Sequence, residues 1–121
     1  VTIFACGHLV WEALEAAKAL EAEGINAEVI NIHTIKPLDK EAIIASAKKT
    51  GAIVTCEEHL INNGLGDSVA QGLAMNYPTP MEYVAVDDKF GESGTPDEML
   101  TNYGLRSKDI IAKVHAVLKR K

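Results

Sequence analysis

The residues best suited to chemistry stand in the middle of the sequence, as Glu57-Glu58-His59. They follow directly on an apolar run over residues 52–56 that is typical of a buried strand. A carboxylate beside an imidazole can orient it for general acid or base catalysis. The same side chains could instead cap a helix or pair across a subunit interface. No nucleophile or second motif stands beside them, which favours the structural or interface role.

A glycine-rich stretch, Asn63-Gly64-Leu65-Gly66-Asp67, enters a predicted helix and invites comparison with a phosphate cradle. Neither the dinucleotide-binding spacing nor the P-loop spacing is present. Asp67 would also put a negative charge where a phosphate has to sit, and could itself accept from the free N–H groups. A tight turn and close packing of the helix on the sheet therefore explain these glycines better.

Two cysteines and two histidines could be combined as a tetrahedral zinc set, namely Cys6, His8, Cys56 and His59. However, both cysteines lie within apolar strand runs, where a free cysteine usually behaves as a small hydrophobic residue. We therefore expect no metal site.

The elements that must position these residues are short apolar runs alternating with amphipathic stretches. Strands are expected over residues 1–6, 27–32, 52–56 and 81–86. Helices are expected over residues 9–23, 40–50, from Gly66 to about 76, at 97–102 as a short turn, and from a Ser107 cap to the C-terminus. In the first helix the predicted core stripe is Val10, Leu14, Ala17 and Leu20. Gly24 and Gly51 are placed to end two of the helices.

Strands separated by helices are typical of parallel βαβ units. The sequence therefore predicts one α/β domain spanning residues 1–121, a three-layer α/β/α sandwich with a mainly parallel sheet of four to five strands. In such a sheet, ligands and partners gather beyond the carboxyl ends of the strands. The polar residues that follow the predicted strands form a candidate interface or positioning edge: His8, His33, Glu57, Glu58, His59 and Asp87.

We expect this edge to position or dock rather than to catalyse. Glu57 stands closest to its strand, so we expect it to be buried and to accept backbone N–H groups of the turn over residues 62–66. His115 is expected to be a surface or packing residue of the last helix. The basic residues 119–121 are expected to be a solvated helix terminus that the helix dipole favours. Trp11 and Tyr83 are expected to fill core or interface.

Composition excludes several classes of protein. The chain is 47% hydrophobic and 24% charged, as in ordinary globular proteins. Its net charge of -5, without a long basic run, argues against a nucleic-acid partner. Its apolar stretches are far shorter than the roughly 20 residues of a membrane span. Two cysteines give no disulfide framework and fit a reducing compartment, so we expect a cytoplasmic protein. Because the sequence opens at Val1 inside a predicted strand, we expect a piece of a longer protein.

Three segments carry a resemblance to a known family. They are Cys6-Gly7-His8-Leu9-Val10, then residues 51–59 (GAIVTCEEH) followed by Gly64-Leu65-Gly66, and residues 89–94 (KFGESG) followed by Tyr103-Gly104-Leu105. In this order, across nearly the whole chain, they resemble the C-terminal domain of the transketolase family. That superfamily also holds deoxyxylulose-phosphate synthase and the E1 β chains of 2-oxo acid dehydrogenases.

The resemblance implies a dimeric enzyme that uses thiamine diphosphate and a divalent metal such as Mg²⁺ to move a two-carbon ketol unit between sugar phosphates. In that family the first domain holds the diphosphate and metal, and the second supplies the carboxylate that activates the cofactor. The resemblance therefore assigns no catalytic, cofactor-binding or metal residue to this sequence, and implies that this domain alone is inactive. Its partners would be the N-terminal and middle domains, in the same chain or in a separate subunit.

Two alternatives remain open at this point. The chain could be the C-terminal domain of an E1 β chain or of a deoxyxylulose-phosphate synthase. It could also be a stand-alone binding or regulatory module that has kept the fold and lost the enzyme. The sequence before Val1 would distinguish them, and the family's sheet commonly carries an additional strand there.

Overall fold

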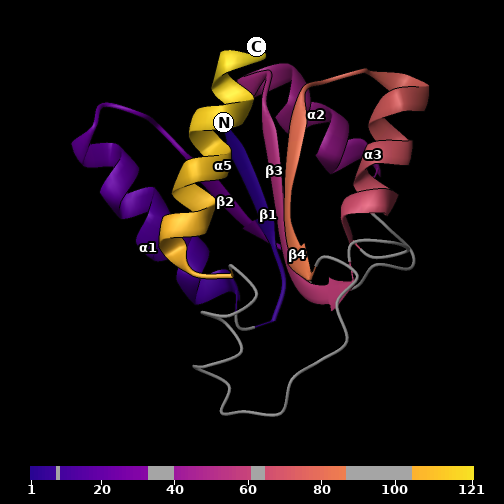
Figure 1. Cartoon of the computed structure of the whole chain (residues 1–121). Coiled ribbons are helices and arrows are strands. Elements are labelled where there is room, and N and C mark those ends of the chain that lie inside the picture. Colours follow the sequence, from indigo (N-terminus) through magenta and orange to yellow (C-terminus); the bar gives the residue numbers. More distant parts are fainter. Residues whose placement is uncertain (8, 33–39, 61–64, 87–104) are drawn as a thin grey trace.

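The computed structural model describes residues 1–7, 9–32, 40–60, 65–86 and 105–121, with residues 58–60 and 86 described for their backbone only. Strands and helices alternate along these ranges (Figure 1). In chain order they are β1 (Thr2–Ala5), α1 (Leu9–Ala22), β2 (Glu28–Asn31), α2 (Lys40–Thr50), β3 (Ile53–Leu60), α3 (Leu65–Asn76), β4 (Met81–Val86) and α5 (Ser107–Lys119). The predicted turn at 97–102 lies outside the described residues.

The strands form one four-stranded sheet in the order β2-β1-β3-β4, and every neighbouring pair is parallel. The chain passes from β1 outward to β2, then crosses to β3 and passes outward to β4 on the other side. The strand order therefore reverses between β1 and β3. The carboxyl ends of these two strands flank the switch point at which open α/β sheets usually bind ligands.

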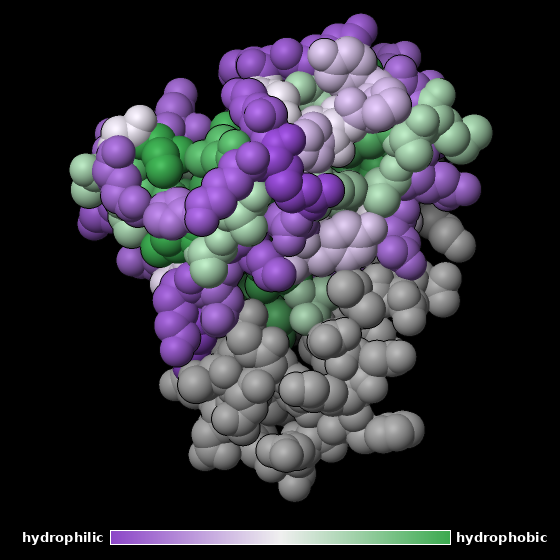
Figure 2. All heavy atoms as spheres, turned by 45° about the horizontal axis from the view of Figure 1, so that its top comes forward, coloured by the Kyte–Doolittle hydropathy of each residue, from purple (hydrophilic) through white to green (hydrophobic). Residues whose placement is uncertain are grey.

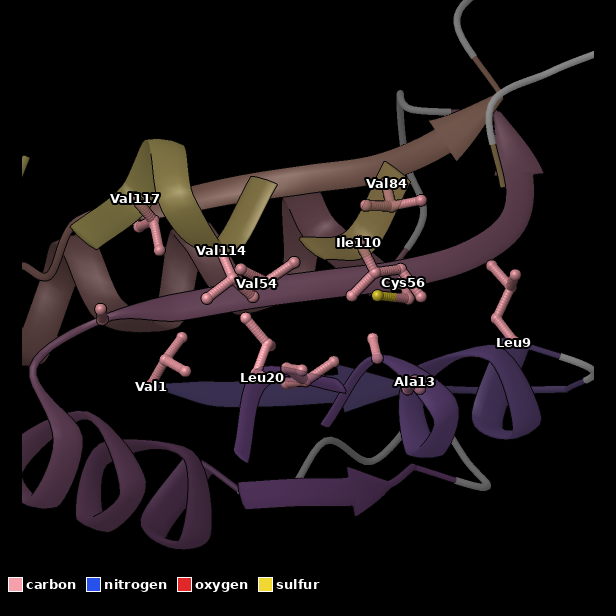
Figure 3. Packing of buried hydrophobic residues seen from close by; sticks show 14 of the residues in the cluster. Val1, Leu9, Ala13, Leu20, Val54, Cys56, Val84, Ile110, Val114 and Val117 are labelled. Atoms are coloured by element: carbon pink, nitrogen blue, oxygen red, sulfur yellow. The ribbon is translucent and has the colours of Figure 1, made fainter. Parts of the chain in front are cut away.

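Helices cover both faces of the sheet, which confirms the three-layer architecture. On one face, α1 and α5 pack on β1 and β3 around a cluster that includes Leu9, Leu20, Val54, Ile110 and Val114 (Figure 3). On the other face, α2 and α3 pack on a second cluster that includes Phe4, Ile43, Ile53, Leu65 and Val69. Because helices cover both faces of the sheet, β1 and residues 53–57 of β3 are buried at every position rather than at alternate ones.

Two helix ends agree with the predicted glycine stops. Gly24 has φ +80° and Gly51 has φ +74°, a left-handed conformation that glycine adopts without a steric penalty. The N–H of Gly51 also donates to the carbonyl of Ala47 at 2.8 Å, which ends α2. None of the helices within the described ranges is long and apolar enough to cross a membrane.

The third strand is longer than the sequence predicted. It continues past Cys56 to Leu60, which pairs with Val86 of β4 after a shift of register. Glu57, Glu58 and His59 therefore lie within β3 rather than after it. A strand continues through polar residues as long as its backbone has a neighbouring strand to pair with. Here β4 extends far enough to pair with Leu60.

The predicted core stripe of α1 was right at Leu20 and displaced by about one residue at its other positions. The residues that α1 buries are Leu9, Ala13, Ala16 and Leu20, whereas Leu14 remains 47% exposed. Both stripes have helical spacing, so periodicity alone could not choose between them. The small side chains of Ala13 and Ala16 suit the face that packs against the sheet.

The start of α5 also differs from the prediction. Its N-cap is Arg106, and Ser107 is its first helical residue. The Arg106 N–H donates to Asp109 Oδ2 at 2.9 Å, and the Ser107 N–H donates to Glu12 Oε2 at 3.1 Å. Ser107 is therefore not the cap, because carboxylates of Asp109 and Glu12 supply the acceptors.

Candidate functional site

The most informative residue at the carboxyl edge is Glu57, which has no exposed surface. Its Oε1 accepts the N–H of Leu65 at 2.8 Å, and its Oε2 accepts the N–H of Gly66 at 2.7 Å. These N–H groups belong to the first turn of α3, where the helix leaves its donors free and its dipole favours a negative charge. The prediction that Glu57 is buried and holds this turn is confirmed.

This contact bears on whether the N-terminus of α3 could bind a phosphate. The position that an anion would take at the start of the helix is filled by the protein's own carboxylate. Asp67 Oδ1 accepts a hydrogen bond from the Tyr83 hydroxyl at 3.4 Å. The described part of the glycine-rich stretch, from Leu65 on, is therefore a structural junction whose first two N–H groups are occupied. Asn63 and Gly64 lie outside the described residues.

Gly66 allows α3 to lie directly on the sheet. A Cβ at this position would stand 2.8 Å from two ring atoms of Tyr83 and 3.0 Å from Thr55 Oγ1. Real Cβ atoms do not tolerate such distances, so a larger residue would push the helix away. The close helix–sheet packing predicted for this glycine is confirmed. Thr55 is buried under the turn, and its hydroxyl has no hydrogen-bond partner among the described residues.

Tyr83 completes this junction from β4. Partial burial raises the pKa of its hydroxyl above the ordinary value, and the neighbouring Asp67 carboxylate raises it further. The Tyr83 hydroxyl therefore stays protonated and donates a hydrogen bond to the Asp67 carboxylate. The ring packs against α3, as expected for an aromatic residue that fills space rather than forming a binding platform.

A second glutamate caps another helix at this end of the sheet. Glu12 of α1 accepts Arg106 Nη1 at 3.0 Å and the N–H of Ser107 at 3.1 Å. Sequence reasoning missed this contact, since Glu12 and Arg106 are 94 residues apart in the chain. No local pattern distinguishes Glu12 from an ordinary acidic residue in the first turn of a helix.

The other residues of the predicted edge fall outside what the structure describes. His8, His33 and Asp87 lie outside the described residues. Glu58 and His59 have their backbone in β3, but their side chains lie outside the description. Their shared role as an interface or positioning edge stays a prediction.

The positions of the two cysteines rule out the candidate zinc set. Cys56 is buried in the cluster under α1 and α5, whereas Cys6 packs against the cluster under α2 and α3. The two thiols therefore lie on opposite faces of the sheet and cannot share one ion. Burial raises the pKa of the Cys56 thiol well above its usual range, which disfavours the thiolate that zinc requires. No cluster of three or more potential ligands exists among the residues that the structure describes.

The described residues do not fit a thiamine diphosphate site. A diphosphate needs free N–H donors or cations and a metal needs grouped carboxylates, whereas the N–H groups of Leu65 and Gly66 are already taken by Glu57. Within the described ranges no three potential metal ligands lie together.

The last helix is held at two further points. Arg120 pairs with Glu82 and donates to the carbonyl of Met81 at 2.8 Å. The prediction that the basic end is only solvated is therefore wrong at Arg120. Lys113 also lies 3.7 Å from Glu82. The half-exposed ring of His115 lies 3.0 Å from Glu23, which confirms a surface role.

Comparisons with known proteins agree with this architecture. Among relatives, "6-deoxy-6-sulfo-D-fructose transketolase subunit SqwH" of Clostridium sp. (strain MSTE9) is 48% identical over 121 residues, and the match covers 100% of this chain and 38% of that protein. An apulose-4-phosphate transketolase subunit of Phocaeicola vulgatus (strain ATCC 8482 / DSM 1447 / JCM 5826 / CCUG 4940 / NBRC 14291 / NCTC 11154) is 38% identical over 91% of this chain and 35% of its own length. A 1-deoxy-D-xylulose-5-phosphate synthase of Heliobacterium modesticaldum (strain ATCC 51547 / Ice1) is 40% identical over 91% of this chain and 17% of its own length.

Two solved structures are similar. One, described as "Split gene transketolase, inactive beta4 tetramer", superposes with a TM-score of 0.94 at 49% identity, over 98% of this chain and 39% of that chain. A transketolase from Campylobacter jejuni subsp. jejuni NCTC 11168 shares the fold, with a TM-score of 0.66 at 19% identity, over 95% of this chain and 16% of that chain. The chain thus spans well under half of the length of these relatives. The family model "Transketolase, C-terminal domain" matches residues 1–110, so the chain belongs to the transketolase C-terminal domain family.

Proposed function

We propose that this chain is the C-terminal domain of an enzyme that transfers a two-carbon ketol unit between sugar phosphates. Within that enzyme the domain serves assembly and positioning rather than chemistry. The contact of Glu57 with the start of α3 supports this assignment. Near the switch point, the helix terminus that could bind an anion is filled by a buried carboxylate of the domain itself.

Thiamine diphosphate and a divalent metal would be bound elsewhere in the enzyme. The rest of it would come as N-terminal and middle domains, either in one polypeptide or in a separate subunit. The printed names of two relatives are those of transketolase subunits, which supports a companion chain. We further propose that the complete enzyme is a cytoplasmic homodimer of such units.

In this arrangement the carboxyl edge is the docking surface for the missing domains. Glu57 and Glu12 fix the starts of α3 and α5 at this end of the sheet, so the edge is built on rigid helix termini. His8, His33, Glu58, His59 and Asp87 would supply its polar contacts.

A deoxyxylulose-phosphate synthase is the second candidate, because such enzymes occur among the relatives at 40% identity. The transketolase subunit relative is favoured, since it matches at 48% identity over the whole chain.

Calorimetric titration of the isolated chain with thiamine diphosphate and Mg²⁺ tests the proposal. We expect no binding and no ketol transfer by the chain alone, and ketol transfer once the companion domains are added. A micromolar dissociation constant for the isolated chain would refute the division of labour. Absence of ketol transfer in the assembled enzyme, with deoxyxylulose-phosphate synthesis instead, would favour the second candidate.

A further inference from the structure

Helix α1 buries one apolar face in the domain and carries two large apolar side chains outside it. Leu9, Ala13, Ala16 and Leu20 point into the core, whereas Trp11 is 73% exposed and Leu14 is 47% exposed. Only four of the fourteen residues of α1 are charged. Trp11 and Leu14 share the exposed side of α1 with Glu15, Lys18 and Glu21. They therefore form an exposed apolar patch with a charged rim, a pattern typical of an interaction site.

The exposed face continues into a hollow beside the start of β2. Leu14 lines this hollow together with Ala17, Ile25 and Ala27, and the space has a volume of about 530 Å³. Lys18 and Glu21 line the hollow as well, so its wall is partly charged. On the face seen in Figure 2, apolar atoms are rimmed by hydrophilic ones on the side where α1 lies. Trp11 and Leu14 are one helical turn apart, and we call these two residues and the hollow the α1 outer face.

We propose that the α1 outer face docks the part of the transketolase that lies outside these 121 residues, with Trp11 as the anchor. This inference rests on the proposed function. The relatives are long enough to supply the cover, because this chain matches only 38% of the transketolase subunit relative and 39% of the split-gene transketolase chain. Tryptophan is also the residue type most enriched among the few that dominate interface energies.

Charge favours this occupant over a second copy of the same chain. Glu15 and Glu21 are exposed on α1, and Lys18 is the one cation of that helix. Two copies placed face to face would bring like carboxylates together within an apolar contact, and such juxtapositions are unfavourable. A partner with an apolar pocket and a basic rim would complement the α1 outer face.

The test uses the single tryptophan of the chain. The chain is labelled with 5-fluorotryptophan and mixed with the unlabelled polypeptide that carries the remaining domains. Fluorine NMR then reports the solvent exposure of Trp11 through the shift between H₂O and D₂O. We expect a full solvent shift in the chain alone and its loss in the assembled enzyme.

A pair of variants gives the energetic readout. Trp11→Asp should raise the companion concentration for half-maximal ketol transfer at least tenfold, and Trp11→Ala should raise it in the same direction. Met75→Asp is the matched control, since Met75 is 75% exposed but lies on α3, across the sheet from α1. We expect the control to stay within twofold of the unmodified chain.

Three results would overturn the inference. The first is a Trp11 that keeps its solvent shift in an assembled, active enzyme. The second is a Trp11→Asp chain that assembles as tightly as the control. The third is loss of the solvent shift on concentrating the chain without its companion, which would identify a second copy as the occupant. Failure of the unmodified chain to support any ketol transfer would instead refute the proposed function.

Discussion

At the scale of single residues, Glu57 is a charge with no exposed surface, and two N–H groups of α3 compensate it. In Glu57→Gln one of the two acceptor oxygens becomes an NH₂ donor that faces another donor. We expect the free energy of unfolding, measured by urea denaturation, to fall by about 1–3 kcal/mol.

The matched control is Glu41→Gln, a neutralised carboxylate at an exposed position of α2. It should change stability by less than about 0.5 kcal/mol. In the complete enzyme the turnover of folded Glu57→Gln protein should stay within about tenfold of normal, a change equivalent to about 1.4 kcal/mol. Unchanged stability with a thousandfold loss of turnover would make Glu57 a chemical residue and contradict its structural assignment.

Gly66 offers a second test within the same turn. In Gly66→Ala the added Cβ would meet the Tyr83 ring at 2.8 Å, so we expect a loss of about 1–3 kcal/mol from overpacking. Gly72 lies in the same helix with nothing within 4 Å of its would-be Cβ. Gly72→Ala should therefore raise stability by roughly 0.5–1 kcal/mol, because alanine is the better helix former. Thermal unfolding of the two variants side by side would show the opposite signs, and a neutral Gly66→Ala would contradict the close contact.

At the scale of elements, α1 fixes where α5 begins. Glu12→Ala removes both the ion pair with Arg106 and the acceptor for the Ser107 N–H. We expect a cost of about 1–2 kcal/mol, the range for losing a helix cap. Hydrogen exchange should show the loss first in the N-terminal turn of α5. Glu15→Ala, at an exposed position one turn further along α1, is the control and should leave that exchange unchanged.

The contact between α3 and β4 should respond to alkaline pH. Burial and the Asp67 carboxylate raise the pKa of Tyr83, so the folded state holds this proton more tightly than the unfolded state does. The resulting stabilisation is complete below the unfolded pKa of about 10 and is lost as the pH rises through the higher folded value. Ultraviolet titration of tyrosinate, with Tyr83→Phe for assignment, measures it. Asp67→Asn should lower the pKa of Tyr83, and an unaltered titration would refute the coupling.

The sequence predicted elements well where local chemistry decides them. Apolar runs bounded by residues such as Gly24 and Gly51 marked strands and helix ends that the structure contains. The length of β3 could not be predicted, because it depends on how far β4 runs beside it. The buried face of α1 could be predicted only in part, since Val10, Leu14 and Ala17 have the same helical spacing as the residues that pack on the sheet.

At the scale of the whole molecule, the candidate site also contains some contacts that local sequence predicts and others that depend on the packed fold. Glu57 could be assigned because it follows a buried strand and precedes a glycine-rich helix start, all within ten residues of sequence. The pairing of Glu12 with Arg106 depends on α1 and α5 lying together on one face of the sheet, which no local pattern records. Contacts of long sequence separation become visible only in the folded domain.

The same whole-molecule reasoning predicts how the chain behaves alone. Its α1 outer face is apolar but bordered by Glu15 and Glu21, and the chain carries a net charge of -5, so copies should attract one another only weakly. In the homodimer proposed above, the C-terminal domain would add to a two-fold interface rather than create it. Sedimentation velocity over a range of concentrations should therefore show a monomer or a loose dimer. A related split-gene transketolase chain is described as an inactive β4 tetramer, but this chain matches only 39% of it. A stable ring or filament of the 121-residue chain would contradict the prediction and place a strong interface between copies within this domain.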